Sequence, residues 1–406
     1  MPLARSFRRW FPWLVLGTAG SLPAQITVVR PAVPDAGSQP RQVLAIGSVA
    51  APRVELARSA PATAAAIERG LGWLLARQQT DGRWDCDGLD DGAGRAVHDI
   101  AVTGLALLAL AREGAAARTE PRREAMLRGV HWLALQQQEN GLLGPRATHD
   151  FIYDHATATL GLAAAAAATG SAEAGTALRA AVGYLETHRN PYMVWRYMPR
   201  DGDNDTSVTT WATLACLAAR EVGVEAPAPA FDAVRQYLKQ VTDADGRTGY
   251  ARAGEPSSRA RATEQRFPPQ HGEAMTAAGI LCRSALGESL ADDGPLAAGI
   301  RLVLAKPPSW EPGAGKVDLC YWFFASEALR RAGGAGRAAW TDALQQALSA
   351  GQRDDGSWDA IDPWGQDGGR LYSTALAVLA LQALYDVPAL QPQPAAPPSE
   401  PEPAAK

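Results

Sequence analysis

Residues 69–84 read RGLGWLLARQQTDGRW, and this stretch sets a spacing that the chain uses again. Counted from Trp73, Gln78 stands five residues later, Gly82 nine and Trp84 eleven. The same offsets recur, completely or in part, at Trp132, Gln137, Gly141 and Leu143, at Ala347, Gln352, Gly356 and Trp358, and at Tyr184 and Trp195. An offset repeated at intervals of about 50 residues is typical of an array of similar supersecondary units, none of which can bury its apolar face alone.

Helical patterns of two kinds alternate around these marks. One kind is amphipathic and charged, as expected of outer helices with one solvated face, and covers 67–79, 126–138, 178–188, 231–240, 296–304 and 340–351. The other kind is apolar nearly all round, needs cover on every side, and covers 99–112, 155–169, 205–221, 273–286, 318–331 and 371–385. The alternation predicts an all-α fold, an α/α toroid with six inner and six outer helices.

Five threonines occupy similar places near the start of the inner helices. They are Thr103, Thr159, Thr209, Thr276 and Thr374. A threonine hydroxyl in a helix can bond the carbonyl four residues earlier, and the small side chain permits close helix contact. We therefore interpret these residues as packing positions rather than ligand contacts.

The size and charge of the chain bound its organisation and its partners. The 406 residues carry 39 Lys and Arg against 43 Asp and Glu, and no basic stripe could neutralise phosphates, so we expect no nucleic-acid partner. The repeat indicates one toroid domain at 62–386, after a linker or N-terminal arm at 25–61. The Pro- and Ala-rich tail at 387–406 cannot bury a core, so we expect it to be disordered.

Residues 1–24 have the pattern of a signal peptide. Arg5, Arg8 and Arg9 precede an apolar run at 10–20, and residues 22–24 read Leu-Pro-Ala, as at a cleavage site. The run is shorter than the about 20 residues that a transmembrane helix needs, so we expect no membrane span. The pattern predicts a periplasmic or secreted protein, with an uncleaved interfacial anchor as the alternative.

Residues 69–84 resemble the QW repeat of squalene and oxidosqualene cyclases, and the alternating helices are similar to those of protein prenyltransferase β subunits. Segments 99–104, 153–156, 205–209 and 369–376 resemble the exported bacterial prenyltransferase and squalene oxidase repeat proteins. The resemblance covers nearly all of residues 62–386. It implies a terpenoid cyclase-like toroid, and the chemistry then depends on individual residues.

The cyclase chemistry requires an Asp that protonates an alkene inside a dry aromatic cavity. The resemblance implies that this acid lies in the segment 202–206, Gly-Asp-Asn-Asp-Thr. Asn204 stands at the position of the proton donor, and an amide cannot donate that proton. Asp203 or Asp205 could serve as a displaced acid, although Asp205 also fits the N-cap of the following helix.

The prenyltransferase chemistry requires Zn²⁺, which the resemblance places on an Asp, a Cys two residues later and a His on a later helix. Asp318 and Cys320 match the first two ligands, and Ser373 stands where the His is implied. We therefore expect no cofactor, with zinc as the alternative if another histidine completes the incomplete Asp318 and Cys320 pair.

Polar residues gather at the predicted N-terminal ends of the inner helices, which should meet at one mouth because inner and outer helices alternate. The carboxylates fit helix caps, whereas the histidines fit capping less well and suit acid–base work. The candidate catalytic residues are His98, Asp99, Asp154, His155, Asp203, Asp205 and His271. The candidate ligand contacts are Trp211, Tyr321, Trp322 and Tyr372, although aromatic residues at helical spacing are also typical of core.

Three functions are consistent with these observations. The first is an exported toroid that binds an extended apolar or peptide ligand in its central cavity without intact family catalysis. The second is an active terpenoid cyclase or transferase with a displaced acid, which requires Asp203 or Asp205 to face a closed apolar cavity. The third is a glycan-cleaving α/α toroid, which requires two carboxylates about 5 to 9 Å apart in an open groove.

Overall fold

The computed structural model describes residues 50–89, 93–259 and 263–385. The predicted signal peptide at 1–24, residues 25–49 of the predicted arm and the predicted tail at 387–406 lie outside the described residues. Helix α1 (Ala50–Ser59) falls in the segment expected to be a linker or arm. Leu56 is buried and belongs to the hydrophobic core, which explains why a helix without a strong apolar face of its own is held here.

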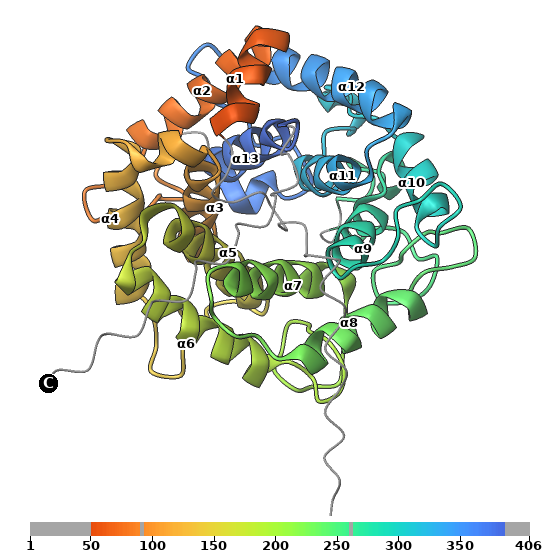
Figure 1. Ribbon diagram of the computed structural model, residues 1–406, viewed down its shortest axis with the longest axis horizontal. Coiled ribbons are helices and arrows are strands. Elements are labelled where there is room, and N and C mark those ends of the chain that lie inside the picture. Colours follow the sequence, from red (N-terminus) through yellow and green to blue (C-terminus); the bar gives the residue numbers. More distant parts are fainter. Residues whose placement is uncertain (1–49, 90–92, 260–262, 386–406) are drawn as a thin grey trace, which may run out of the picture. The chain divides into compact units, whose positions relative to one another are not determined.

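The predicted all-α toroid is confirmed for the described residues. The outer helices are α2 (Pro61–Ala76), α4 (Arg122–Leu135), α6 (Ala172–His188), α8 (Ala228–Gln240), α10 (Ala297–Leu304) and α12 (Ala335–Gly351). The inner helices are α3 (Asp99–Ala111), α5 (Phe151–Thr169), α7 (Thr206–Glu221), α9 (Ala274–Ala285), α11 (Leu319–Ala332) and α13 (Gly365–Gln382). Figure 1 shows the six inner helices arranged around a centre, with the outer helices surrounding them.

At three of the repeated turns, a glutamine joins one outer helix to the next. Gln78 donates from Nε2 to the carbonyl oxygen of Gly82 in its own turn and to that of Ala125 in α4, both at 2.8 Å. Gln137 and Gln352 make the same pair of bonds, with the second acceptor on the following outer helix. The glutamine therefore links neighbouring repeats.

The structure reveals a further copy of the spacing. The same offsets occur at Tyr237, Thr242, Gly246 and Thr248. Thr242 and Thr248 form an antiparallel β-bridge, as Gln352 and Trp358 do. The copy lacks both the Gln and the Trp, which hid it in the sequence. Its glycine has φ of +86°, a left-handed value that a residue without Cβ adopts without strain.

Hydrogen bonds connect the turns to the inner ring. They involve the tryptophan at the last mark of the repeat spacing and the threonine near the start of the inner helix. Trp84 donates from Nε1 to the carbonyl oxygen of Leu74 at 2.7 Å, and Trp195 and Trp358 make the same bond ten residues back. The backbone N–H of Trp84 donates in turn to the hydroxyl of Thr103 at 3.0 Å. Thr209, Thr276 and Thr374 accept the equivalent bonds. Of the five threonines, Thr159 makes the expected bond to the carbonyl four residues earlier.

Helices α3 and α5 approach each other closely through two glycines. A Cβ added to Gly104 would lie 2.5 Å from the Cα of Ala158, and one added to Gly161 would collide with the main-chain oxygen of Gly104. No larger residue fits either position without moving one helix, because these atoms belong to the backbone. Gly104 and Gly161 therefore set the distance between α3 and α5 in the inner ring.

A buried polar layer lies at the C-terminal ends of the inner helices. Arg112, which follows α3, pairs through Nη2 with Oε1 of Glu327 on α11 at 2.6 Å. Arg330 pairs with the other oxygen of Glu327 at 3.0 Å. Gln382 on α13 donates to Glu113 at 2.6 Å. Arg112, Glu113, Glu327 and Gln382 are at most 1% exposed, so this end of the ring is filled by paired polar groups.

The described helices were also compared with what a bilayer requires. Within residues 50–385 apart from the two short gaps, no helix combines the length and the apolar character needed to cross a membrane.

Candidate functional site

A cavity of about 720 Å³ lies among the N-terminal turns of the inner helices. Each inner helix or the residues just before it contributes to the wall, because the inner helices run parallel and begin at the same end of the ring. The apolar part of the wall includes Val102, Leu105, Trp211, Met275 and Phe324. The cavity is therefore a mainly apolar space in the centre of the toroid, with polar groups concentrated near its opening.

His98 and Asp154 form the most closely coupled polar pair in the cavity wall. His98 Nδ1 lies 2.9 Å from Oδ1 of Asp154, and the side chains are 12% and 8% exposed. Burial raises the pKa of Asp154 to about 6, against the lowering effect of His98. Burial works to lower the pKa of His98, but the hydrogen bond and the charge of Asp154 outweigh it and raise that pKa. Each member of the pair therefore stabilises the charged form of the other.

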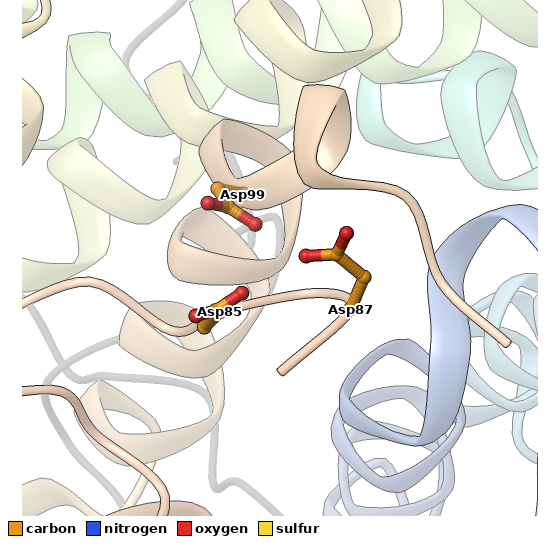
Figure 2. Close-up of side chains that lie close together, drawn as sticks. All are labelled: Asp85, Asp87 and Asp99. Carbon is orange, nitrogen blue, oxygen red and sulfur yellow. The ribbon is translucent and has the colours of Figure 1, made fainter. Parts of the chain in front are cut away.

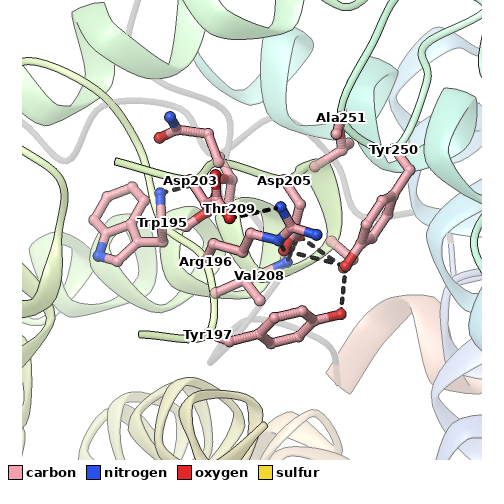
Figure 3. Close-up of polar contacts among 12 residues, drawn as sticks. Trp195, Arg196, Tyr197, Asp203, Asp205, Val208, Thr209, Tyr250 and Ala251 are labelled. Atoms are coloured by element: carbon pink, nitrogen blue, oxygen red, sulfur yellow. Dashed lines mark hydrogen bonds and ion pairs between the residues drawn. The ribbon is translucent and has the colours of Figure 1, made fainter. Parts of the chain in front are cut away.

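A network of tyrosines leads from the cavity to Asp205. Asp205 accepts the backbone N–H of Val208 at 2.8 Å, as the N-cap of α7, and the hydroxyl of Ser207 at 2.9 Å. Tyr250 donates to its other oxygen at 3.3 Å and also hydrogen-bonds the hydroxyl of Tyr197 (Figure 3). Burial raises the pKa of Asp205 to about 6. The carboxyl is 0% exposed and is absent from the cavity wall, whereas both tyrosines line it.

The other members of the acidic segment face away from the cavity. The Asp203 side chain is 70% exposed and lies 3.3 Å from Nη1 of Arg196 (Figure 3). Asn204 accepts the backbone N–H of Val194 through Oδ1 at 3.1 Å and donates to the carbonyl of Gly202. Asp203 is therefore a solvated carboxylate and is not among the residues that line the cavity. Asn204 serves as a turn-stabilising amide.

The residues that resemble a zinc site do not form one. Asp318 accepts the backbone N–H of Tyr321 through Oδ1 at 2.9 Å, and its Oδ2 lies 3.0 Å from Nη2 of Arg259. A guanidinium thus stands where a metal would bind this carboxylate. Cys320 lines the cavity, and burial raises the pKa of its thiol well above the ordinary value. Ser373 is 0% exposed at the third position, so the residues present do not fit a prenyltransferase-type zinc ion.

One group of carboxylates has ligand atoms close enough for a cation. Asp85, Asp87 and Asp99 have oxygens within 4.8 Å of one another, the only such set in the described part of the chain (Figure 2). Asp99 accepts the backbone N–H of Cys86 at 2.7 Å, and its other oxygen lies 3.4 Å from Nε of Arg83. Burial raises its pKa to about 6. Asp99 therefore stabilises the loop after α2. It was a candidate catalytic residue, and it is not among the residues that line the cavity.

Two of the predicted histidines also lie outside the cavity. His155 is 0% exposed, accepts the backbone N–H of Leu143 through Nδ1 at 3.0 Å and lies 3.1 Å from the carbonyl of Ala181 through Nε2. Burial lowers its pKa to about 3, so it stays neutral and takes the place of the turn-binding threonine in its repeat. His271 lies 3.4 Å from the carbonyl of Gly315 and does not line the cavity. The structure therefore does not bring these two histidines to the cavity wall with His98.

The predicted ligand contacts divide evenly. Trp211 and Tyr372 line the cavity. Tyr321 instead donates its hydroxyl to the carbonyls of Val303 and Lys306 at the end of α10. Trp322 is 1% exposed and packs against Trp310, so it belongs to the core between the rings.

Several cavity residues were missed by the sequence analysis, and some of them lie in loops between the helices. Tyr197 and Tyr250 each stand two residues beyond the last mark of a repeat, after Trp195 and Thr248. Both side chains line the cavity, so that offset could have identified them. His149 packs its ring 5.1 Å from that of Tyr197. Further unpredicted polar and aromatic residues of the wall include Arg95, Asp150, Tyr153, Thr157, Ser207, Ser258, Arg259, Trp364 and Asp367.

Solved structures share this arrangement of helices. A variant of the type II terpene cyclase MstE from Scytonema, in complex with its product merosterolic acid A, is 15% identical and aligns over 83% of this chain and 99% of its own, with a TM-score of 0.54. The fold is the terpenoid cyclase-like α/α toroid. A protein from Actinoplanes (17% identity, 79% and 98% coverage) and a glycosidase variant (14% identity, 83% and 98% coverage) each align with a TM-score of 0.50. No protein-family model and no curated protein sequence matches the chain.

The likeness reaches the fold and stops there. At 14 to 17% identity, a terpenoid cyclase-like toroid can carry unrelated chemistries, as the cyclase and the glycosidase in the same comparison illustrate. The function of this chain therefore depends on its own cavity residues.

Proposed function

We propose that this terpenoid cyclase-like toroid binds an extended apolar molecule in its central cavity, without the alkene protonation of the cyclases. The observation that supports the proposal is the cavity of about 720 Å³, walled by Val102, Leu105, Trp211, Met275 and Phe324. A concave apolar space with a few convergent polar groups is the usual form of a small-molecule site. Burial of an apolar chain there contributes about 25 cal/mol for each Å² removed from water.

The acidic segment supports binding over cyclisation. A general acid must present its proton to the reacting atom inside the cavity. Asp203 is solvated, Asn204 is an amide, and Asp205 is covered by Tyr250. A displaced acid acting through Tyr250 and Tyr197 is the second candidate, favoured by the hydrogen-bonded path from Asp205 to the cavity. It predicts cyclised products from a polyprenyl substrate, detectable by mass spectrometry, and we expect none.

The carboxylates of the cavity give less support to a glycan-cleaving function. Asp154 is held by His98, and Asp367 lies 3.4 Å from Arg95. Hydrolysis of a glycosidic bond needs one carboxyl as acid and a second as base or nucleophile, both directed at the sugar. We also propose that the chain is exported, as its N-terminal sequence predicts, and that it acts without zinc. Cell fractionation and metal analysis of the purified protein test these two proposals.

A cavity-filling variant tests the binding function. Ala101 lines the cavity, so Ala101→Trp should place an indole in the space a ligand would occupy. Ala350, near the end of α12, is exposed, and Ala350→Trp is the matched control. We expect a fluorescent polyprenyl probe to bind the wild type and the control with micromolar affinity, and Ala101→Trp at least tenfold more weakly. Failure of the wild type to bind any apolar probe would contradict the proposal.

A further inference from the structure

The His98 and Asp154 pair leaves one nitrogen directed at no protein group. His98 Nδ1 is engaged by Oδ1 of Asp154 at 2.9 Å, whereas Nε2 is buried and has no hydrogen-bond partner. Oδ1 of Asp150 is likewise buried without a partner. Asp150 and Asp154 are one helical turn apart at the start of α5, so they lie on the same face, and all three residues line the cavity.

Unpartnered polar atoms in such a place are costly. Leaving a buried donor or acceptor without a partner destabilises the protein, so protein groups or bound molecules normally satisfy it. Nothing else in the mechanics of the fold uses His98 Nε2, since the imidazole is already oriented by Asp154. The atom is therefore available to an occupant of the cavity.

The charges around His98 restrict what that occupant can be. Asp154 and Asp150 face the imidazole from α5, Asp367 faces it from α13, and Arg95 is the nearby cation, itself 3.4 Å from Asp367. Three carboxylates against one guanidinium disfavour an anionic end group. An ammonium end group has donors only, so it cannot pair with Nε2 whenever that nitrogen carries a proton. A neutral hydroxyl suits both states, because it can donate to Nε2 or accept from Nε2–H.

We propose that the His98 and Asp154 pair binds the hydroxyl end of an apolar alcohol, through His98 Nε2, and so fixes the direction in which the molecule lies in the cavity. This inference rests on the proposed function, since the chain of the alcohol occupies the same apolar space. Among the described residues that line the cavity, His98 Nε2 and Asp150 Oδ1 are the buried side-chain atoms without a hydrogen-bond partner. The polar end therefore stays at His98.

The test compares three probes with the same fifteen-carbon isoprenoid chain: the alcohol farnesol, its methyl ether and the matching carboxylic acid. Affinities are measured on the full-length protein by displacement of a fluorescent apolar dye at pH 7.5. In the wild type, we expect the alcohol to bind about tenfold more tightly than the ether, since one hydrogen bond to a buried polar group is worth about 1.4 kcal/mol. The carboxylate should bind more weakly than the alcohol.

Two variants locate the effect. His98→Leu removes Nε2 and should weaken the alcohol to the affinity of the ether, while the affinity of the ether is unchanged. His131 pairs with Glu173 at the same 2.9 Å distance but is 58% exposed, so His131→Leu is the matched control and should leave the alcohol preference intact. Asp154→Asn keeps the shape of the pair, and should reduce the preference by loosening the orientation of the imidazole.

The outcomes separate this inference from the proposed function. If no probe binds the wild type, the proposed function fails. If the alcohol and the ether bind the wild type equally, or if the carboxylate binds most tightly, cavity binding stands and the role of His98 is overturned. The wild-type series gives this answer even if a variant does not fold.

Discussion

Gln352 donates from Nε2 to the main-chain oxygen of Ala66, 286 positions earlier in the chain, at 2.9 Å. The bond joins the turn after α12 to α2, the first outer helix of the ring. Gln78 and Gln137 make the same bond to the following outer helix. The last repeat therefore contacts the first in the way that other repeats contact the next one along the chain. A single side chain thus joins the last repeat of the array to the first.

Removing this closure bond should destabilise the toroid measurably. Gln352→Met preserves size but leaves the carbonyls of Ala66 and Gly356 without their donor, which should cost about 1 to 3 kcal/mol. Gln346→Met, on the exposed face of α12, is the control and should be nearly neutral. Urea denaturation followed by circular dichroism gives both values. Equal midpoints for the two variants would show that the closure bond contributes nothing.

The glycines between α3 and α5 should tolerate no methyl group. Gly161→Ala would place Cβ against the main-chain oxygen of Gly104, and overpacking of this kind typically costs about 1 to 3 kcal/mol. Gly183→Ala in α6 meets nothing within 4 Å and should stabilise the protein by about 0.5 to 1 kcal/mol, because Ala is the better helix former. Thermal unfolding should therefore shift in opposite directions. A shift in the same direction would contradict the close contact.

The buried salt bridge below the cavity should be sensitive to loss of one partner. Glu327→Gln leaves the Arg112 guanidinium buried without its countercharge, and breaking a buried pair in this way costs about 3 to 5 kcal/mol. Glu124→Gln breaks the exposed pair with Arg128 in α4 and should cost less than about 0.5 kcal/mol. Chemical denaturation compares them. Similar small losses would show that the buried charges are compensated elsewhere.

The neutral His155 should make stability depend on pH in a defined direction. Its pKa falls from 6.5 to about 3 on folding because of burial, so the unfolded chain binds more protons between these values. The contribution of this group is therefore complete above pH 6.5 and decreases by up to about 1.4 kcal/mol per pH unit as the pH falls. His155→Gln can make both backbone bonds without titrating. Its stability relative to wild type should improve by about 2 kcal/mol between pH 7.5 and 5.0, measured by denaturant unfolding.

The sequence was sufficient for the ring because its signals are local and repeated. The offset from Trp73 to Trp84 recurs where each turn must pack on the next outer helix, and the apolar inner helices need cover on all sides. The copy beginning at Tyr237 escaped notice because Thr242 and Thr248 replace the Gln and the Trp and bond through their hydroxyls, 2.9 Å apart. The geometry of the turn is thus preserved where its residue types are not.

The cavity was predicted less completely, because a residue's position at the start of an inner helix does not determine which way it points. His98 and Asp154 reach the cavity, whereas His155, the next residue along α5, points about 100° away and binds the turn after α4. Asp205 was placed correctly as a cap, and its link to Tyr250 depends on a contact between distant loops. Such contacts leave no periodic trace in the sequence.

The buried ion pair of Arg112 and Glu327 limits how a ligand can move through the inner ring. Both residues are at most 1% exposed and costly to separate, so they close the far end of the inner ring to a ligand. A ligand would then enter and leave at the end of the ring where the inner helices begin. The distance between that end and the ion pair then limits the length of the apolar chain that can bind, which would make the toroid selective for chain length.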